Sequence, residues 1–172
     1  MEKKTIWTIG HSTHPIAEFI EMLQSFKIEL LADIRSYPSS KFCPQFNEDA
    51  LQKSLAEAAI DYIHLPALGG RRKPKQDSKN TIWRNAGFRG YADYMETTEF
   101  KNGIIELEEL ALKKATAYMC SEAFYLKCHR SMVSDFLKSR NWTVMHVMGI
   151  NKTTEHNYTQ PTKITGGKLS YH

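Results

Sequence analysis

Short apolar runs alternate with segments of helical periodicity along most of the chain, and this alternation limits the possible folds more than any other feature. Five runs have the length and composition of strands, and they cover residues 6–9, 30–34, 62–65, 115–119 and 143–148. Between them, apolar residues recur at helical spacing over 16–26, 47–59, 91–95, 102–114 and 128–140. Strands that alternate with helices form βαβ units with right-handed crossovers. The pattern predicts a single-domain α/β fold: a three-layer, open, mainly parallel sheet of about five strands with helices on both faces.

The length and composition agree with one globular domain. The 172 residues are 41% hydrophobic and 24% charged, which is typical of a folded protein rather than a disordered or fibrous one. We assign residues 1–155 to the α/β domain. Residues 156–172 mix Thr, Gly, Lys and Pro, and we expect a loosely ordered C-terminal tail there. The sequence alone does not fix the strand order or the oligomeric state.

Composition also bears on the compartment and the partners. The chain has no apolar run of roughly eighteen residues, the length of a membrane-spanning helix, so no membrane partner is expected. Residues 1–7 lack the features of a signal peptide. Three cysteines are a small and odd number, which favours reduced thiols in the cytoplasm over a disulfide framework. The formal net charge of +4 permits an anionic partner without requiring one.

Polar residues follow the first strand, where ligands of open α/β sheets bind. These residues are Gly10, His11 and Ser12. A glycine lets the backbone approach a ligand closely, and the start of the following helix offers free N–H groups to an anion. A tight turn with a hydroxyl cap explains the same residues. The glycine motifs of Walker-type NTPases and of Rossmann dinucleotide-binding proteins are absent, and no motif identifies a cofactor.

Arginines follow the second and third strands. Arg35 stands at a strand end, where its guanidinium can clamp a phosphate or carboxylate with two hydrogen bonds. An Asp33–Arg35 pair that holds the loop is the structural alternative. Arg71 has the corresponding place after Gly70 and opens a basic loop that extends to residue 85. A solvated basic loop is the alternative there.

The densest cluster of reactive side chains follows the fourth strand. Its members are Cys120, Glu122, Cys128, His129 and Arg130. Cys128 stands where a helix begins, and such a position lowers a thiol pKa and favours the thiolate. One interpretation is a reactive thiol with Glu122 or His129 as acid or base. A second is a metal site of Cys120, Cys128 and His129, and a third is a pair of buried thiols beside a capped helix.

The spacing between cysteine and arginine residues argues against a cysteine phosphatase. Cysteine phosphatases cradle phosphate with Cys-x5-Arg. The positions that would carry the arginine are Leu126 and Ser134. The cysteine phosphatases are therefore disfavoured. His146 lies within the last predicted strand and reads as a hydrogen-bonded core histidine rather than a ligand.

Several motifs, taken in order, resemble a known family. They are Thr8–Ser12, Asp33–Ser39, Leu68–Gly70, Phe88–Met95, and Met119–Glu122 with Cys128–Arg130. They resemble the bacterial and archaeal family catalogued as domain of unknown function 488, and the likeness runs from about residue 5 to residue 150. The resemblance implies a compact cytoplasmic α/β fold and implies that residues 120–130 carry a motif. It implies no particular activity, and residues after Asn151 lie outside it.

Three hypotheses follow. In the first, the protein is an enzyme that binds, and chemically processes, a phosphate-bearing small molecule or nucleotide. Arg35 and Arg130 grip the anion, Gly10 to Ser12 supply backbone donors, Cys128 or Glu122 acts as nucleophile or base, and His129 carries the proton. In the second, it is a non-catalytic nucleic-acid-binding module in which residues 71–75 contact phosphates and the aromatic residues near Tyr91 provide a stacking surface. In the third, Cys120, Cys128 and His129 bind a metal.

Overall fold

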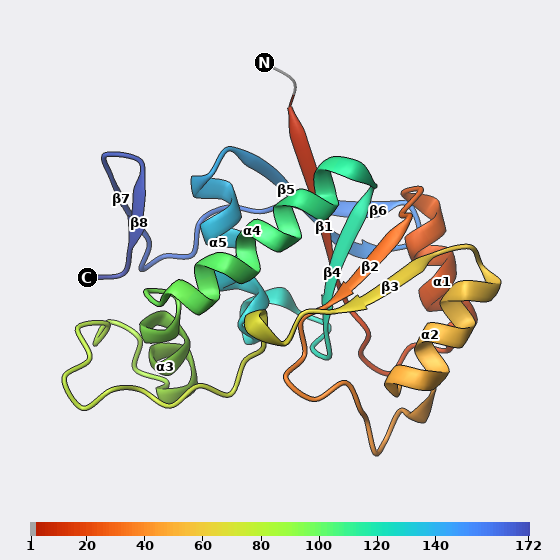
Figure 1. The fold of residues 1–172 in the computed structure, drawn as a ribbon, viewed down its shortest axis with the longest axis horizontal. Coiled ribbons are helices and arrows are strands. Elements are labelled where there is room, and N and C mark those ends of the chain that lie inside the picture. The colour runs from red at the N-terminus through yellow and green to blue at the C-terminus, as the bar shows by residue number, and fades with distance from the viewer. Residues whose placement is uncertain (1–2) are drawn as a thin grey trace.

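The computed structural model describes residues 3–172 and shows an α/β fold (Figure 1). In chain order its strands and α-helices are β1 (Lys4–Gly10), α1 (Ile16–Ser25), β2 (Leu30–Asp33), α2 (Glu48–Glu57), β3 (Asp61–His64), α3 (Ala86–Tyr94), α4 (Thr98–Lys113), β4 (Thr116–Cys120), α5 (Arg130–Ser139), β5 (Trp142–Gly149), β6 (Lys152–Glu155), β7 (Lys163–Thr165) and β8 (Lys168–Ser170). The five predicted strands are present. The predicted mainly parallel sheet is confirmed.

The central sheet has the strand order β3-β2-β4-β1-β5-β6. The strands β1 to β5 pair with one another in parallel. β6 is antiparallel to β5 and is a sixth strand that the apolar pattern did not predict. The turn between β5 and β6 contains Asn151, with φ 56°. Asparagine tolerates this left-handed conformation better than most residues, so the turn suits its sequence.

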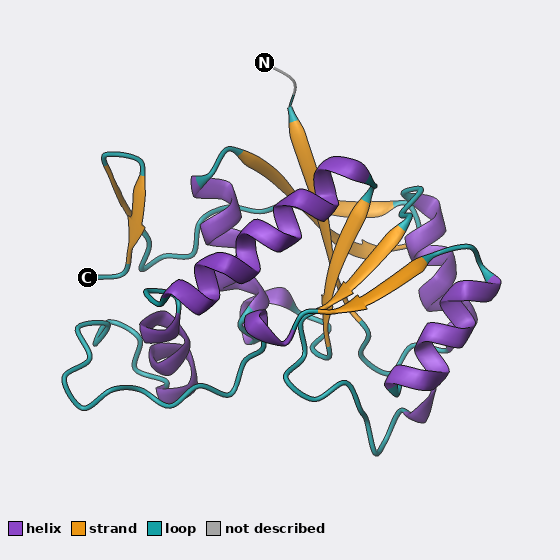
Figure 2. Ribbon diagram, in the orientation of Figure 1, coloured by secondary structure: helices purple, strands orange, loops and turns teal. Residues whose placement is uncertain are grey.

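Helices cover both faces of the sheet, so the fold has three layers (Figure 2). Residues of α1 and α2 form one core cluster with Ile9 and Leu31 of the sheet. Residues of α3, α4 and α5 form the other cluster with Ile6 and Tyr118. Successive side chains of a strand point to opposite faces, which explains why Ile6 and Ile9 of the same strand lie in different clusters. Burying both faces fits the continuous apolar strands of a parallel sheet.

The C-terminal segment packs against the domain, which corrects the expectation of a loosely ordered tail over residues 156–172. His156 and Tyr171 are buried, and Tyr171 belongs to the core cluster of α4 and α5. The β7–β8 hairpin stands apart from the central sheet, near the C-terminus in Figure 1. Both buried side chains reach the Asp135 carboxylate of α5, as described below. The polar composition of the segment gave no sign of this distant partner.

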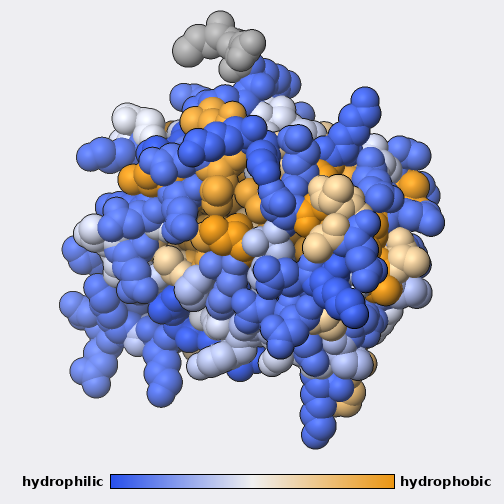
Figure 3. Space-filling view, turned by 45° about the vertical axis from the view of Figure 1, so that its right-hand side comes forward, coloured by the Kyte–Doolittle hydropathy of each residue, from blue (hydrophilic) through white to orange (hydrophobic). Residues whose placement is uncertain are grey.

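Charged and polar side chains cover most of the face shown in Figure 3, and apolar side chains appear between them in patches. Over residues 3–172, no helix has both the length and the apolar character needed to cross a membrane.

Candidate functional site

The loops that follow β1 and β4 diverge at the carboxyl edge of the sheet. β1 and β4 are neighbours, but the chain leaves β1 for α1 on one face and leaves β4 for α5 on the other. The arrowheads of β2, β3 and β4 converge at this edge in Figure 2. In open α/β sheets, ligands bind at such a point of divergence. The topology therefore selects this edge before any side chain is considered.

A cavity of about 550 Å³ opens at this edge. Its volume lies within the range of ligand sites in proteins. Loops after four strands and the start of α3 contribute to its wall. Seven of the residues singled out in the sequence line it, namely His11, Arg35, Arg71, Cys120, Glu122, Cys128 and His129. Gly10, Ser12 and Arg130 do not line it.

Cationic side chains outnumber acidic ones in the cavity wall. Arg35, Arg71 and Lys127 face a single carboxylate, Glu122. The loop after Arg35 adds the hydroxyls of Ser36, Ser39 and Ser40, and the loop after β4 adds that of Ser121. Lys127 and these serines were not among the site residues predicted from the sequence. Ser36 and Ser121 follow closely on strand ends, which is the signal that would have found them. Lys127, Ser39 and Ser40 lie six or seven residues beyond a strand and carry no such signal. The cavity wall therefore carries more positive than negative side chains, together with several hydroxyl groups.

Arg35 is held firmly by its own loop. Its guanidinium donates from Nε and Nη2 to the Asp33 carboxylate, at 2.9 and 2.7 Å, and also from Nη2 to the carbonyl of Phe46. The Asp33–Arg35 pair proposed as the structural alternative is therefore present. Nη1 makes one contact, at 3.4 Å to Nε2 of His11, and Arg35 also lines the cavity. Most of its hydrogen-bonding capacity thus positions the residue, and Nη1 remains for a ligand.

His11 forms a flat wall of the cavity beside Arg35. Its ring stacks on Phe46, with ring centroids 4.3 Å apart. Nδ1 lies 2.8 Å from the carbonyl oxygen of Ser12, which can only accept, so Nδ1 carries the proton. Burial lowers the pKa of His11 to about 4 and keeps the ring neutral at neutral pH. His11 therefore serves as a polar wall rather than as a cation.

Gly10 and Ser12 have structural roles that differ from the predicted ones. A Cβ on Gly10 would lie 1.7 Å from the carbonyl oxygen of Glu122, so the glycine allows two loops, not a ligand, to approach closely. The N–H groups of His11 and Ser12 donate to the carbonyls of Cys120 and Ser121. Backbone donors for an anion from Gly10 to Ser12 are therefore not free. Gly10 and Ser12 line a separate hollow of about 260 Å³.

The two cysteines of the site lie in contact. Sγ of Cys120 and Sγ of Cys128 are 2.9 Å apart, and the N–H of Arg130 points to Sγ of Cys128 at 3.4 Å. The hydrogen bond from the Cys120 thiol, together with the charge and N–H of Arg130, lowers the pKa of Cys128 despite its partial burial. Burial raises the pKa of Cys120 well above its usual value. Cys128 is therefore the thiol that ionises, as its place before α5 predicts.

Arg130 is buried, which corrects its predicted role as a ligand clamp. Nη1 donates to the hydroxyl of Thr8, and Nη2 donates to the carbonyls of Glu122 and Ala123. These bonds hold the loop that carries the cavity residues after β4. Within residues 3–172, Nε of Arg130 has no hydrogen-bond partner, although it is buried. Arg130 is thus a positioning residue whose charge lies beside the Cys128 sulfur.

His129 is also used in packing. Its Nε2 lies 3.0 Å from the carbonyl of Ile34 and donates to it, while its ring meets the edge of Tyr91. Burial lowers the pKa of His129 to about 4, so at neutral pH the ring carries no proton to give beyond the one bound to Ile34. Among residues 3–172, no cluster of three or more His, Cys, Asp or Glu side chains is arranged to hold a metal ion.

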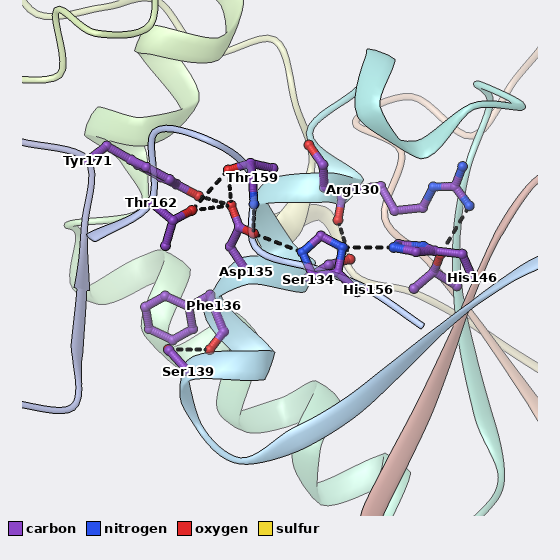
Figure 4. A network of polar contacts seen from close by, with 12 residues as sticks. Arg130, Ser134, Asp135, Phe136, Ser139, His146, His156, Thr159, Thr162 and Tyr171 are labelled. Atoms are coloured by element: carbon purple, nitrogen blue, oxygen red, sulfur yellow. Dashed lines mark hydrogen bonds and ion pairs between the residues drawn. The ribbon is translucent and has the colours of Figure 1, made fainter. Parts of the chain in front are cut away.

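A chain of buried polar groups connects Arg130 to the C-terminal segment (Figure 4). Thr8 lies 2.6 Å from Nδ1 of His146, and Nε2 of His146 lies 2.8 Å from Nδ1 of His156. Nε2 of His156 then contacts Asp135 at 2.8 Å. We refer to these groups as the polar relay, and its members are Arg130, Thr8, His146, His156 and Asp135. All of them are at most 1% exposed.

Every hydrogen bond of the polar relay can run in one direction. Arginine only donates and a carboxylate only accepts, so each group between Arg130 and Asp135 accepts one hydrogen bond and donates the next. Burial lowers the pKa of His146 far below its usual value, which keeps this ring neutral. The prediction of a hydrogen-bonded core histidine is confirmed. Asp135 was missed because it lies inside α5, and His156 because it was assigned to a loosely ordered tail.

The aromatic motif over residues 88–95 is divided between packing and the cavity. The hydroxyls of Tyr91 and Tyr94 donate to the carbonyls of Leu68 and Ala67, which fixes α3 against the loop after β3. Phe88 lines the cavity at the start of α3. In the basic loop, the Asp93 carboxylate accepts hydrogen bonds from residues 75, 78 and 80. The loop is thereby tied to α3, and Arg71 lies over the exposed ring of Tyr37.

Fold and site together define an open α/β domain with a thiol-bearing, cationic cavity at the carboxyl edge of its sheet. A model of the family described as "Domain of unknown function DUF488" matches residues 15–137. This match covers more than half of the chain, and the protein belongs to that family. No curated protein and no solved structure matches it. His146 and His156 of the polar relay lie beyond the matched residues.

Proposed function

We propose that the protein binds a phosphate-bearing small molecule or nucleotide in the cavity and that Cys128 is the nucleophile toward it. One observation carries the proposal: the more acidic thiol of the pair and three cationic side chains line the same cavity. Either feature alone has a structural explanation. Together they pair a reactive sulfur with a means of holding an anionic substrate against it.

The anion is bound by the groups that have capacity left. Arg71 is exposed at the cavity wall, where its stacking on Tyr37 limits its motion, and Lys127 is exposed on the opposite loop. Nη1 of Arg35 lies at the inner wall. The buried Asp33 carboxylate neutralises Arg35. Arg71 and Lys127 against Glu122 then leave a net charge of about +1 for a phosphate group. The rings of Tyr37 and Phe88 add flat surfaces for a base, which is why nucleotides are included.

The chemistry begins at the Cys128 sulfur. The thiolate attacks an electrophilic centre of the bound molecule while Arg35 and Arg71 hold the anionic group. As the bond to sulfur forms, the bond from that centre to its leaving group breaks, and the leaving group takes a proton from Glu122 or from water. Glu122 is the exposed carboxylate of the cavity and serves as the acid or base. His129 has its Nε2 bound to Ile34 and is assigned to positioning instead.

A thermal-shift titration with inorganic phosphate, pyrophosphate and ADP tests the proposal. A ligand at 100 times its Kd stabilises the folded state by about 2.7 kcal/mol. For a chain of this length, that corresponds to a rise in Tm of about 5–10 °C. Arg71→Ala combined with Lys127→Ala is expected to abolish the rise. Lys101→Ala, an exposed lysine on α4, is the control for lost charge and is expected to retain it.

Alkylation of Cys128 supplies the second arm of the test. A ligand seated in the cavity is expected to slow the reaction of Cys128 with iodoacetamide, measured by peptide mass spectrometry. The proposal is wrong if none of the three probes raises Tm or protects Cys128. It is also wrong if the double variant responds to ADP as the unaltered protein does.

A single-stranded nucleic acid is the second candidate ligand. The observation that favours it is the exposed Arg71–Tyr37 stack at the cavity, next to Lys73 and Lys75 on the basic loop. Such a surface would contact phosphates and stack on a base. Binding of a labelled oligonucleotide would then weaken steeply between 50 and 200 mM salt, as counterion release requires. Absence of binding at low salt contradicts this candidate.

A further inference from the structure

The two thiols are close enough to form a disulfide, and binding an anion does not require such a contact. A disulfide requires an S–S distance of about 2.05 Å, so the 2.9 Å between Cys120 and Cys128 leaves about 0.9 Å to close. Cys120 ends β4, and Cys128 stands two residues before α5. The chain between them is a loop with one short 3-10 helix, which can absorb so small an approach.

The two thiols differ in access, which gives them different roles. Both cysteines line the cavity, but Cys128 is partly exposed whereas Cys120 is only 2% exposed. The N–H of Arg130 points to Cys128 and stabilises negative charge on that sulfur. A small oxidant that enters the cavity therefore meets Cys128 first, and Cys120 is the group already in contact with the product.

We propose that Cys128 and Cys120 form a peroxide-reactive pair, in which a hydroperoxide oxidises Cys128 and Cys120 converts the product into a disulfide. In the first step, the Cys128 thiolate attacks the terminal oxygen of the peroxide. An S–O bond forms, the O–O bond breaks, and the leaving oxygen takes a proton from water to give an alcohol, or water from hydrogen peroxide. Cys128 is then a sulfenic acid.

In the second step, Cys120 sulfur attacks Cys128 sulfur. The S–S bond forms, the S–O bond breaks, and the hydroxide leaves as water with the proton of the Cys120 thiol. The two thiols together supply the two electrons that reduce one peroxide. A dithiol reductant restores both thiols by exchange. The buried position of Cys120 does not prevent this step, because its partner is already in contact.

The oxidation itself does not depend on a phosphate ligand. Its effect on the site does rest on the proposed function, since the disulfide removes the sulfur that acts as nucleophile there. Cys43 supplies an internal control. It is a third free thiol, and it is buried in the other core cluster, among α1 and α2, rather than beside the pair.

The test treats the reduced full-length protein with one equivalent of hydrogen peroxide and maps the thiols by mass spectrometry. Trypsin cleaves after Lys127, so the pair is expected as peptide 115–127 linked to peptide 128–130. Intact mass is expected to fall by two hydrogen atoms, and dithiothreitol is expected to reverse the change. Cys120→Ser is expected to leave a sulfenic acid on Cys128 that dimedone traps, and Cys128→Ser to form neither product. Cys43→Ser is expected to behave as the unaltered protein.

The proposal is overturned if the unaltered protein keeps all three thiols free, or if the link joins Cys43 instead. This mapping needs no variant, so the test survives a serine variant that fails to fold. Disulfide formation without any ligand-induced thermal shift would remove the proposed function and leave the peroxide chemistry. A thermal shift with ADP, in protein that peroxide does not crosslink, would remove the peroxide chemistry and leave the proposed function.

Discussion

The buried carboxylate of Asp135 holds the C-terminal segment to the domain, so Asp135→Asn should destabilise the protein strongly. Asp135 accepts five hydrogen bonds, from His156, the Thr159 amide and hydroxyl, Thr162 and Tyr171 (Figure 4). The residue is 0% exposed. Asparagine keeps the volume but replaces one acceptor oxygen with a donor and removes the charge.

The size of the effect follows from the partners left behind. Removing one member of a buried charged network costs about 3–5 kcal/mol, because the remaining polar groups stay desolvated. Asparagine retains one oxygen that can still accept from His156 and Thr159, and hydroxyls can rotate, so we expect the lower end, about 3 kcal/mol. For a chain of this length, that corresponds to a fall in Tm of about 6–12 °C.

Chemical denaturation followed by circular dichroism measures this loss. Asp77→Asn is the matched control, since Asp77 is exposed and the substitution removes the same charge. We expect Asp77→Asn to change the unfolding free energy by less than about 0.5 kcal/mol. If Asp135→Asn changes it as little, the carboxylate does not anchor the C-terminal segment.

Three further predictions concern the site. Gly10→Ala should lower the unfolding free energy by about 1–3 kcal/mol, because the new Cβ would lie 1.7 Å from a backbone oxygen. Gly149→Ala, where the nearest atom is 3.5 Å away, should lower it less. Equal midpoints of urea unfolding for the two variants would contradict this prediction. His11, with a pKa of about 4, and His146 are neutral in the folded protein, but both protonate below pH ~6.5 in the unfolded chain. As the pH is lowered below that value, the unfolding free energy should therefore decrease, by up to about 1.4 kcal/mol per pH unit for each histidine. An unfolding free energy that stays constant between pH 7 and pH 5 in chemical denaturation would refute this prediction. The alkylation rate of Cys128 should inflect below the pH of about 8.5 that is typical of a free cysteine. An inflection at or above that pH would show that the Cys120 hydrogen bond and Arg130 do not activate the thiol.

The sequence predicts the sheet well where burial dictates composition. β1, β2 and β4 are largely apolar because parallel strands inside a sheet are covered on both faces, so their pattern is visible in the chain. β6 is polar and exposed, as an edge strand can be, and no apolar pattern marks it. The C-terminal segment is held by hydrogen bonds to one distant carboxylate, and such a contact leaves no trace in local periodicity.

The sequence predicts which residues gather at the candidate site, but not the contacts that each of them makes. The strand-end rule placed His11, Arg35 and Cys128 at one edge, where the structure has them. It could not say that Arg130 turns into the interior, because a buried arginine needs acceptors from several elements, and the sequence does not show which elements meet. The same holds for Gly10, whose neighbour is the backbone of a loop more than a hundred residues away.

The polar relay explains how a buried arginine beside the thiol is tolerated. Arg130 is only 1% exposed, and an unpaired charge in such a place is costly. Asp135 lies on the same helix without touching Arg130, and Thr8, His146 and His156 connect the two charges through hydrogen bonds. The negative end of the relay is itself stabilised by the C-terminal segment. The guanidinium of Arg130 stays charged throughout, so the relay fixes its position beside Cys128 rather than its charge. Residues that follow the whole parallel sheet in the chain therefore help to hold the cation that stabilises the Cys128 thiolate.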